Sequence, residues 1–189
     1  MNTLQKRMFA TPPTAGPVMP HVKPLDISQA PSDSQPILQA IEKKFGQSLN
    51  IFNTLAYQPD VLGGVTQIND GIRNDLPEKL RELAYFKSSQ VNGCEYCSHY
   101  HKAAAEKAGA SDAQLADISN YAESDAFDDQ EKAVLEYAEQ LTKRAEVDPA
   151  TVAKLKKFLD DRQLVTLAAT VALANFTNRF NHGLDVQLP

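Results

Sequence analysis

The sequence lacks long apolar runs and basic clusters, and it has only two cysteines in 189 residues. No stretch reaches the roughly 20 apolar residues that a membrane-spanning helix needs, and the N-terminus lacks the compact apolar run of a secretory signal. With 19 basic and 24 acidic residues the net charge is -5, which argues against a nucleic-acid partner. Two cysteines cannot build a disulfide scaffold for a chain this long. We therefore expect a cytoplasmic protein with neither a membrane nor a nucleic-acid partner.

Glycine-rich phosphate loops and flavin or nicotinamide signatures are also absent, so no cofactor is expected. The alternating pattern of β-strands is missing beyond residue 36, and the expected fold class is all-α. Helices are predicted near residues 37–45, 49–57, 59–73, 76–91, 94–108, 128–144, 149–159 and 162–182, with a short one after Ser111-Asp112. In the segment Asp75-Leu76-Pro77-Glu78, a polar cap and a first-turn proline indicate a helix start. The last helix is apolar around most of its circumference, which predicts a central buried helix or an oligomer interface.

Residues 1–36 differ in composition from the rest of the chain, because they hold seven of the eleven prolines. We interpret them as a proline-rich N-terminal arm that precedes one helical domain at residues 37–189. The arm could be disordered, or it could dock against a neighbouring subunit through its apolar residues, which are Val18, Met19, Val22, Leu25 and Ile27.

Both cysteines lie in one short segment, Asn92-Gly93-Cys94-Glu95-Tyr96-Cys97-Ser98-His99-Tyr100-His101. A Cys-x-x-Cys pair with a nearby base is typical of a reversible dithiol. Cys94 follows Gly93 directly, so it should lie in the first turn of a helix, where the free N–H groups and the helix dipole favour an anion. We expect both thiols to gain thiolate character there, which thiol redox chemistry requires.

A histidine and a carboxylate are candidates for proton transfer beside the thiols. His101 lies four residues after Cys97, on the same helical face, whereas His99 points elsewhere. If the chain reverses at Asn92-Gly93, Glu82 comes within one turn of His101. Apolar neighbours could raise the pKa of Glu82 and suit it to a proton shuttle. The alternative is that Glu82 pairs with nearby lysines on a solvated face.

A zinc site built from both cysteines, His99 and His101 is disfavoured, because histidines two residues apart on a helix diverge and a closed tetrahedral site needs four convergent ligands. The dithiol is therefore the expected redox centre, and no metal is expected.

Glu82, Cys94-x-x-Cys97 and His101 at this spacing resemble the signature of the alkylhydroperoxidase D branch of the carboxymuconolactone decarboxylase superfamily, and Cys-x-Tyr-Cys resembles its peroxidase-related members. The resemblance covers residues 37–188 and includes an asparagine-rich last helix. It implies an all-helical alkylhydroperoxidase D-like bundle that forms a homo-oligomer, either a trimer or a dimer-based hexamer.

The resemblance also implies a thiol-dependent peroxidase. Cys97 would attack the hydroperoxide, Cys94 would resolve the sulfenic acid into a disulfide, and His101 with Glu82 would form the proton relay. An external dithiol protein would restore the thiols. Tyr96 stands where the best-known members have a histidine, and it could support the site as a hydrogen-bond donor. The alternatives are a slow redox sensor or binding module of the same fold, or a lactone decarboxylase, against which the dithiol argues.

Overall fold

The computed structural model describes residues 19–189, and within them it contains helices and no strand. The all-α prediction is therefore confirmed. The α-helices are α1 (Gln35–Phe45), α2 (Asn50–Leu55), α3 (Pro59–Gly71), α4 (Glu78–Val91), α5 (Glu95–Lys107), α6 (Asp112–Asp117), α7 (Asp129–Arg144), α8 (Pro149–Leu155) and α9 (Asp161–Leu184). Two 3-10 turns, η1 (Ile27–Gln29) and η2 (Ile118–Asn120), complete the described elements.

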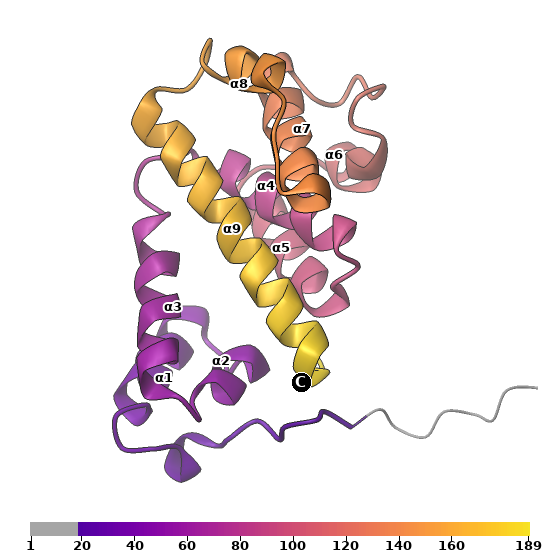
Figure 1. Ribbon diagram of the computed structural model, residues 1–189. Coiled ribbons are helices and arrows are strands. Elements are labelled where there is room, and N and C mark those ends of the chain that lie inside the picture. Colours follow the sequence, from indigo (N-terminus) through magenta and orange to yellow (C-terminus); the bar gives the residue numbers. More distant parts are fainter. Residues whose placement is uncertain (1–18) are drawn as a thin grey trace, which may run out of the picture.

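Helix α9 runs through the middle of the molecule, with α1 to α3 near its C-terminal half and α7 and α8 near its start (Figure 1). It packs against α3, α4, α5 and α7, which agrees with a central position. Its start is fixed by a capping box in which Asp160 and Gln163 bond each other's backbone N–H groups. The predicted cap at Asp75 is wrong, because Pro77 is the residue that caps α4. The Asp75 carboxylate instead bonds Arg162 Nε of α9 at 2.8 Å.

Helix α4 lies between the other helices, and this position determines the environment of the functional side chains that it carries. Every residue from Leu80 through Ser89 is buried. Different faces of α4 join three apolar clusters, through Tyr85 beside α2 and α3, Leu80 beside α7 and α9, and Leu83 beside α6. A helix buried on all sides must pair its polar groups internally, so the charged side chains of α4 have defined partners.

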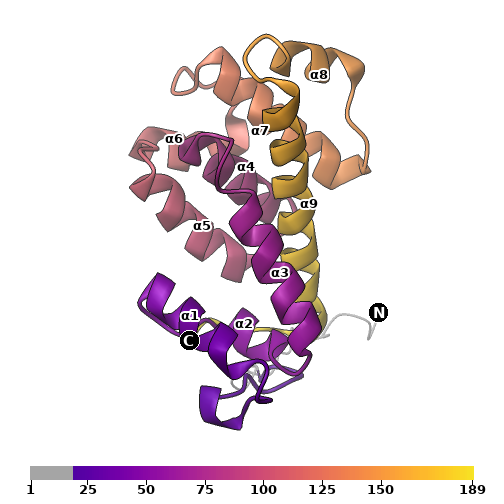
Figure 2. The same cartoon turned by 90° about the vertical axis from the view of Figure 1, so that its left-hand side faces the viewer.

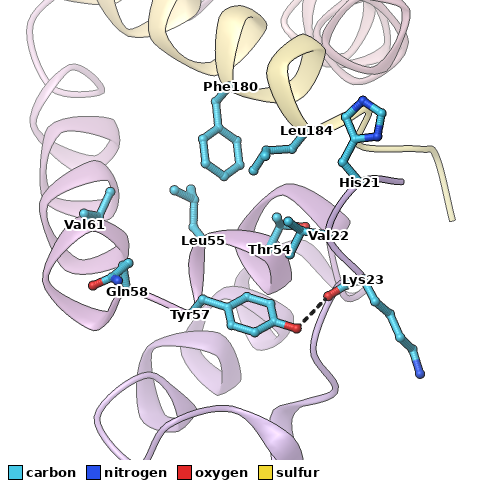
Figure 3. A pocket seen from close by; sticks show the side chains of 10 residues that line it. All are labelled: His21, Val22, Lys23, Thr54, Leu55, Tyr57, Gln58, Val61, Phe180 and Leu184. Carbon is cyan, nitrogen blue, oxygen red and sulfur yellow. Dashed lines mark hydrogen bonds between the residues drawn. The ribbon is translucent and has the colours of Figure 1, made fainter. Parts of the chain in front are cut away.

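The described part of the arm lies against its own chain. The His21 N–H donates to the Leu184 carbonyl at 2.9 Å, and the Leu25 N–H donates to the Asn53 carbonyl at 3.2 Å. Figure 3 shows the arm beside α2 and α9, where the Tyr57 hydroxyl donates to the carbonyl of Lys23. Val18 lies outside the described residues. From residue 19 onward the arm thus contacts α2 and α9 of the same chain.

Within residues 19–189, no helix combines the length and apolar character that crossing a bilayer requires.

The central position of α9 gives a stability prediction with an internal control. Val171 is fully buried between α9 and its neighbours, whereas Val165 on the same helix is 69% exposed. Val171→Ala should lower the free energy of unfolding by about 2 kcal/mol, because it removes buried carbons and leaves a cavity. Val165→Ala should change it by less than about 0.5 kcal/mol. Urea unfolding measures both, and equal effects would show that α9 is not packed as described.

Candidate functional site

The turn between α4 and α5 brings the predicted residues together. Gly93 has a φ of 68°, the left-handed conformation that side chains disfavour, and it reverses the chain. The Cys94 N–H then donates to the Ser89 carbonyl at 2.9 Å and closes the turn. Helices α4 and α5 run side by side in opposite directions (Figure 2). This antiparallel pairing places Glu82 of α4 opposite His101 of α5, as the sequence predicted.

Glu82 is a buried carboxylate with partners on both oxygens. His101 Nδ1 lies 2.8 Å from Oε2, and because the carboxylate accepts, the imidazole proton is on Nδ1. Arg81 donates to Oε1 from Nη2 at 3.0 Å and from Nε at 3.2 Å. Arg81 also bonds Glu78 at 3.0 Å. The alternative of a solvated, lysine-paired Glu82 is therefore wrong, because its side chain is enclosed.

The acidity of Glu82 departs from expectation. Burial opposes its ionisation, but the hydrogen bond and charge of His101, together with Arg81, outweigh burial and hold its pKa below the usual value. The expected raised pKa is wrong, because sequence spacing did not reveal the cationic partner Arg81. Glu82 is thus an ionised acceptor that fixes the orientation and tautomer of His101.

The two cysteines lie at the start of α5, where their sulfurs share hydrogen bonds. Cys94 is the N-cap residue, and its Sγ accepts from the Cys97 N–H at 3.3 Å. From α9, Asn181 Nδ2 donates to Cys97 Sγ at 3.2 Å and lies 4.0 Å from Cys94 Sγ. Both thiols are free and buried. The sulfurs therefore lie between a helix N-terminus and a side-chain amide, both of which favour a thiolate.

The two thiols ionise differently. The hydrogen bond that Cys94 accepts from the Cys97 thiol, aided by the Cys97 backbone N–H and by Asn181, outweighs burial and lowers the pKa of Cys94 to about 6. The same bond, together with burial, raises the pKa of Cys97 above its usual value. The expectation that both thiols become more acidic is thus wrong, because the first thiolate forms on Cys94 and its negative charge opposes ionisation of Cys97.

Tyr85 forms the support for the His101 ring. The two rings stack with centroids 3.5 Å apart and planes inclined by 13°. The Tyr85 hydroxyl shares a 2.7 Å hydrogen bond with Thr177 of α9, and burial raises the pKa of this phenol, so it stays neutral. The imidazole is thereby held by Glu82 at one edge and by Tyr85 on one face.

Tyr96 holds α2 in place. Its hydroxyl accepts from the Ile51 N–H at 3.2 Å, and burial raises the pKa of the phenol. In this position Tyr96 is a neutral hydrogen-bonding group and not a base.

A pocket of about 500 Å³ opens between α1, α2, α3 and α5 and reaches the dithiol. Glu82, Tyr96, Cys97 and His101 all line it, whereas Cys94 is not among the lining residues. His99 is not among the lining residues, as its helical position predicted. A volume of this size suits a small organic ligand. A second pocket of about 670 Å³ beside the arm is lined by no cysteine or carboxylate (Figure 3). The dithiol pocket is therefore the candidate active site.

Sequence analysis missed three residues that contact the predicted ones: Arg81, Tyr85 and Asn181. Arg81 is adjacent to Glu82 in sequence, a spacing that does not put side chains on one helical face. Asn181 left a usable signal, because it follows Asn178 by three residues on an otherwise apolar helix. Within the described part of the chain, no three His, Cys, Asp or Glu side chains converge as metal ligands would.

The shared charge of the dithiol predicts its titration. The reduced protein should gain one thiolate per chain with a midpoint near pH 6, because the lowered pKa of Cys94 makes the ionised form predominate above that pH. Ultraviolet absorbance of the thiolate measures the step. Cys97→Ser should keep a step well below the usual thiol pKa, since serine can also donate to Cys94. Cys94→Ser should remove it, and the opposite pattern would reassign the thiolate to Cys97.

Comparison with known proteins shows similarity to one protein family over part of the chain. The carboxymuconolactone decarboxylase family profile matches residues 59–140, which include Glu82, both cysteines and His101. Over 120 residues the chain is 33% identical to the uncharacterised protein YnjA of Escherichia coli (strain K12). That match covers 60% of this chain and 63% of YnjA, less than two thirds of the relative's length.

Two solved structures share the fold. A peroxidase-related protein from Ralstonia eutropha JMP134, described as an alkylhydroperoxidase AhpD core, has a TM-score of 0.80 at 23% identity, over 93% of this chain and 94% of its own. The debrominase Bmp8, in complex with 2,3,4-tribromopyrrole, has a TM-score of 0.78 at 23% identity, over 89% and 91%. Together these likenesses show that the chain has the alkylhydroperoxidase D-like fold, and that its residues 59–140 match the carboxymuconolactone decarboxylase family.

Proposed function

We propose that this protein is a thiol-dependent peroxidase that reduces hydroperoxides through Cys94 and Cys97. The observation that carries the proposal is the arrangement in one pocket of a dithiol holding a stabilised thiolate and an imidazole bonded to a buried carboxylate. Such a site can supply two electrons and the proton that the leaving group needs.

In the first step, Cys97 Sγ attacks the terminal oxygen of the hydroperoxide, because Cys97 and not Cys94 lines the pocket. Its proton passes to the neighbouring Cys94 thiolate, whose Sγ already accepts a hydrogen bond from the Cys97 backbone N–H. The O–O bond breaks, and the departing alkoxide takes a proton from the imidazolium of His101, directly or through a water. Cys97 becomes a sulfenic acid.

In the second step, Cys94 Sγ attacks Cys97 Sγ, the S–O bond breaks, and the departing hydroxide takes the Cys94 proton to form water. The products are an alcohol, water and a Cys94–Cys97 disulfide. Asn181 suits the intermediate, because its Oδ1 is buried and has no hydrogen-bond partner among residues 19–189. That oxygen can accept the proton of the Cys97 sulfenic acid while Nδ2 stays bonded to sulfur.

Glu82 acts through His101. The ionised carboxylate accepts a hydrogen bond from Nδ1, which leaves Nε2 for the leaving group. Tyr85 fixes the ring plane, and Tyr96 supports the pocket wall. Among these residues only Cys97, Cys94 and His101 exchange bonds or protons with the substrate.

The cycle needs an external dithiol reductant protein, and that requirement suits a reducing compartment such as the cytoplasm. We also propose a homo-oligomer, a trimer or a dimer-based hexamer. Large apolar side chains on the surface of α3 and α9 support assembly: Val61, Ile68 and Phe176 are 42 to 51% exposed.

Reductive dehalogenation is a second candidate, because the debrominase Bmp8 shares the fold and the pocket here has aromatic walls. An aryl bromide and the dithiol would give the arene, bromide, a proton and the same disulfide. Release of bromide from a bromopyrrole, without consumption of hydroperoxides, would favour this reaction. If the dithiol is oxidised once and no dithiol reductant supports repeated turnover, the result would instead indicate a redox sensor.

Replacing each cysteine tests the proposed roles. Cys97→Ser should abolish hydroperoxide consumption, because it removes the attacking sulfur. Cys94→Ser should consume about one equivalent and stop at a sulfenic or over-oxidised Cys97. Mass spectrometry after adding cumene hydroperoxide measures the products, with the Cys94–Cys97 disulfide expected in the parent protein.

Two outcomes would contradict these roles. Free thiols that persist in the parent protein after excess hydroperoxide would exclude the peroxidase. A reactive Cys97→Ser variant beside an inert Cys94→Ser variant would reverse the assignment.

A further inference from the structure

The dithiol pocket has a cationic side chain without a counter-ion. Arg73 follows α3, lines the pocket and lies over the Phe45 ring, 5.9 Å from its centroid. Its Nε is buried and has no hydrogen-bond partner among residues 19–189, and its guanidinium has no ion pair there. Arginine is seldom left in this state, because each buried N–H without a partner costs free energy.

The acidic groups around the pocket are already engaged. Lys44, which lines the pocket, pairs with Asp70, and Glu78 and Glu82 both bond Arg81. The guanidinium of Arg73 therefore faces the pocket without a protein carboxylate. Lys107, at the end of α5, also lines the pocket and has no ion pair within the described chain. An anionic ligand would find uncompensated positive charge here.

The pocket extends along one side of α5. Along α5 it follows one face from Cys97 through His101 and Ala104 to Lys107. The ten residue steps from Cys97 to Lys107 span about 15 Å, at a rise of about 1.5 Å per residue. The sulfur lies at the buried end, with Cys97 only 4% exposed, whereas Phe45 beside Arg73 is 38% exposed.

Between the two ends, apolar side chains form the walls. The Phe45 and Phe52 rings stack 6.3 Å apart, and Phe52 packs against the cluster that contains Cys97. Leu49, Val65 and Leu173 also line the pocket. A ligand that reaches the sulfur from Arg73 must therefore have an apolar body.

We propose that the substrate is an amphiphilic hydroperoxide, the hydroperoxide of a long-chain fatty acid, whose carboxylate binds Arg73. The inference rests on the proposed peroxidase function and adds its substrate class. The planar guanidinium matches a carboxylate in a two-point contact. The carboxylate is unchanged by the reaction, in which the hydroperoxide and the dithiol give the hydroxy acid, water and the disulfide.

The first experiment measures binding without chemistry. Decanoate and the uncharged decanol are titrated into the reduced protein and followed by calorimetry. Arg73→Gln should weaken decanoate binding by about 10- to 100-fold, the usual effect of a hydrogen bond to a charged group, and should leave decanol binding unchanged. Arg73→Lys should recover part of the affinity. Arg144→Gln is the matched control, because Arg144 pairs with Asp148 and lines none of the pocket.

The second experiment compares turnover. The parent protein should have a kcat/KM for linoleic acid hydroperoxide about 10-fold or more above that for its methyl ester. Arg73→Gln should abolish this difference, mainly through KM, with a smaller loss of kcat/KM for cumene hydroperoxide, which carries no carboxylate. Arg144→Gln, outside the pocket, should leave the kcat/KM for all three substrates unchanged.

The two experiments separate the possible failures. Equal kcat/KM for acid and ester in an active parent protein would overturn the proposal, as would decanoate binding that does not depend on Arg73. An equal loss with cumene hydroperoxide in Arg73→Gln would also overturn it. If the parent protein reduces no hydroperoxide, the proposed function fails, and Arg73-dependent decanoate binding still decides whether this is an acid-binding pocket.

Discussion

The carboxylate of Glu82 is the group on which the site depends, because a buried charge must be paired on every side. Arg81 bonds one oxygen and His101 the other, so the charge of α4 can be buried only while α5 lies alongside. Removing one partner of such a buried pair costs about 3 to 5 kcal/mol, since the remaining charge stays desolvated. The same contact that joins the two helices also fixes the imidazole tautomer. Packing and chemistry therefore depend on one hydrogen bond.

A second constraint comes from α9, which places amide side chains against the turn between α4 and α5. Asn181 contacts the sulfurs, while Asn178 and Asn92 bond each other at 2.8 Å. Dipoles fixed by packing stabilise a thiolate without any reorganisation when the substrate arrives. The dithiol then divides its tasks: Cys94 holds the charge and Cys97 faces the pocket. Because of this division, the buried pair can hold a negative charge on one sulfur while the other sulfur remains accessible from the pocket.

The features predicted from sequence were those fixed by helical period and by one glycine. Cys97 and His101 share a face because they are four residues apart, and Glu82 meets His101 because Gly93 reverses the chain between two helices. Contacts between distant segments were not predictable in this way. Asn181 lies more than eighty residues from the cysteines, and only packing of α9 brings it to them.

The order of ionisation was also beyond the sequence. A helix N-terminus favours both thiolates, but which sulfur accepts the shared hydrogen bond depends on atomic positions. Asp75 shows the same limitation, because its carboxylate was expected to cap α4 and bonds Arg162 of α9 instead. No sequence pattern singles out Arg73, since its proposed binding role depends on the absence of a counter-ion around it in the described structure.

The most direct test of the account is a double-mutant cycle between Glu82→Gln and His101→Gln, measured as the rate of hydroperoxide reduction. Because Glu82 acts only through His101, each single change should lower the rate by about 10²- to 10⁴-fold, and the double variant should be no more than a few-fold slower than the slower single variant. His99→Gln, on the same helix but outside the pocket, should leave the rate within a few-fold of the parent. A double variant slowed by the product of the two single effects, or single variants as active as His99→Gln, would contradict a relay through this pair.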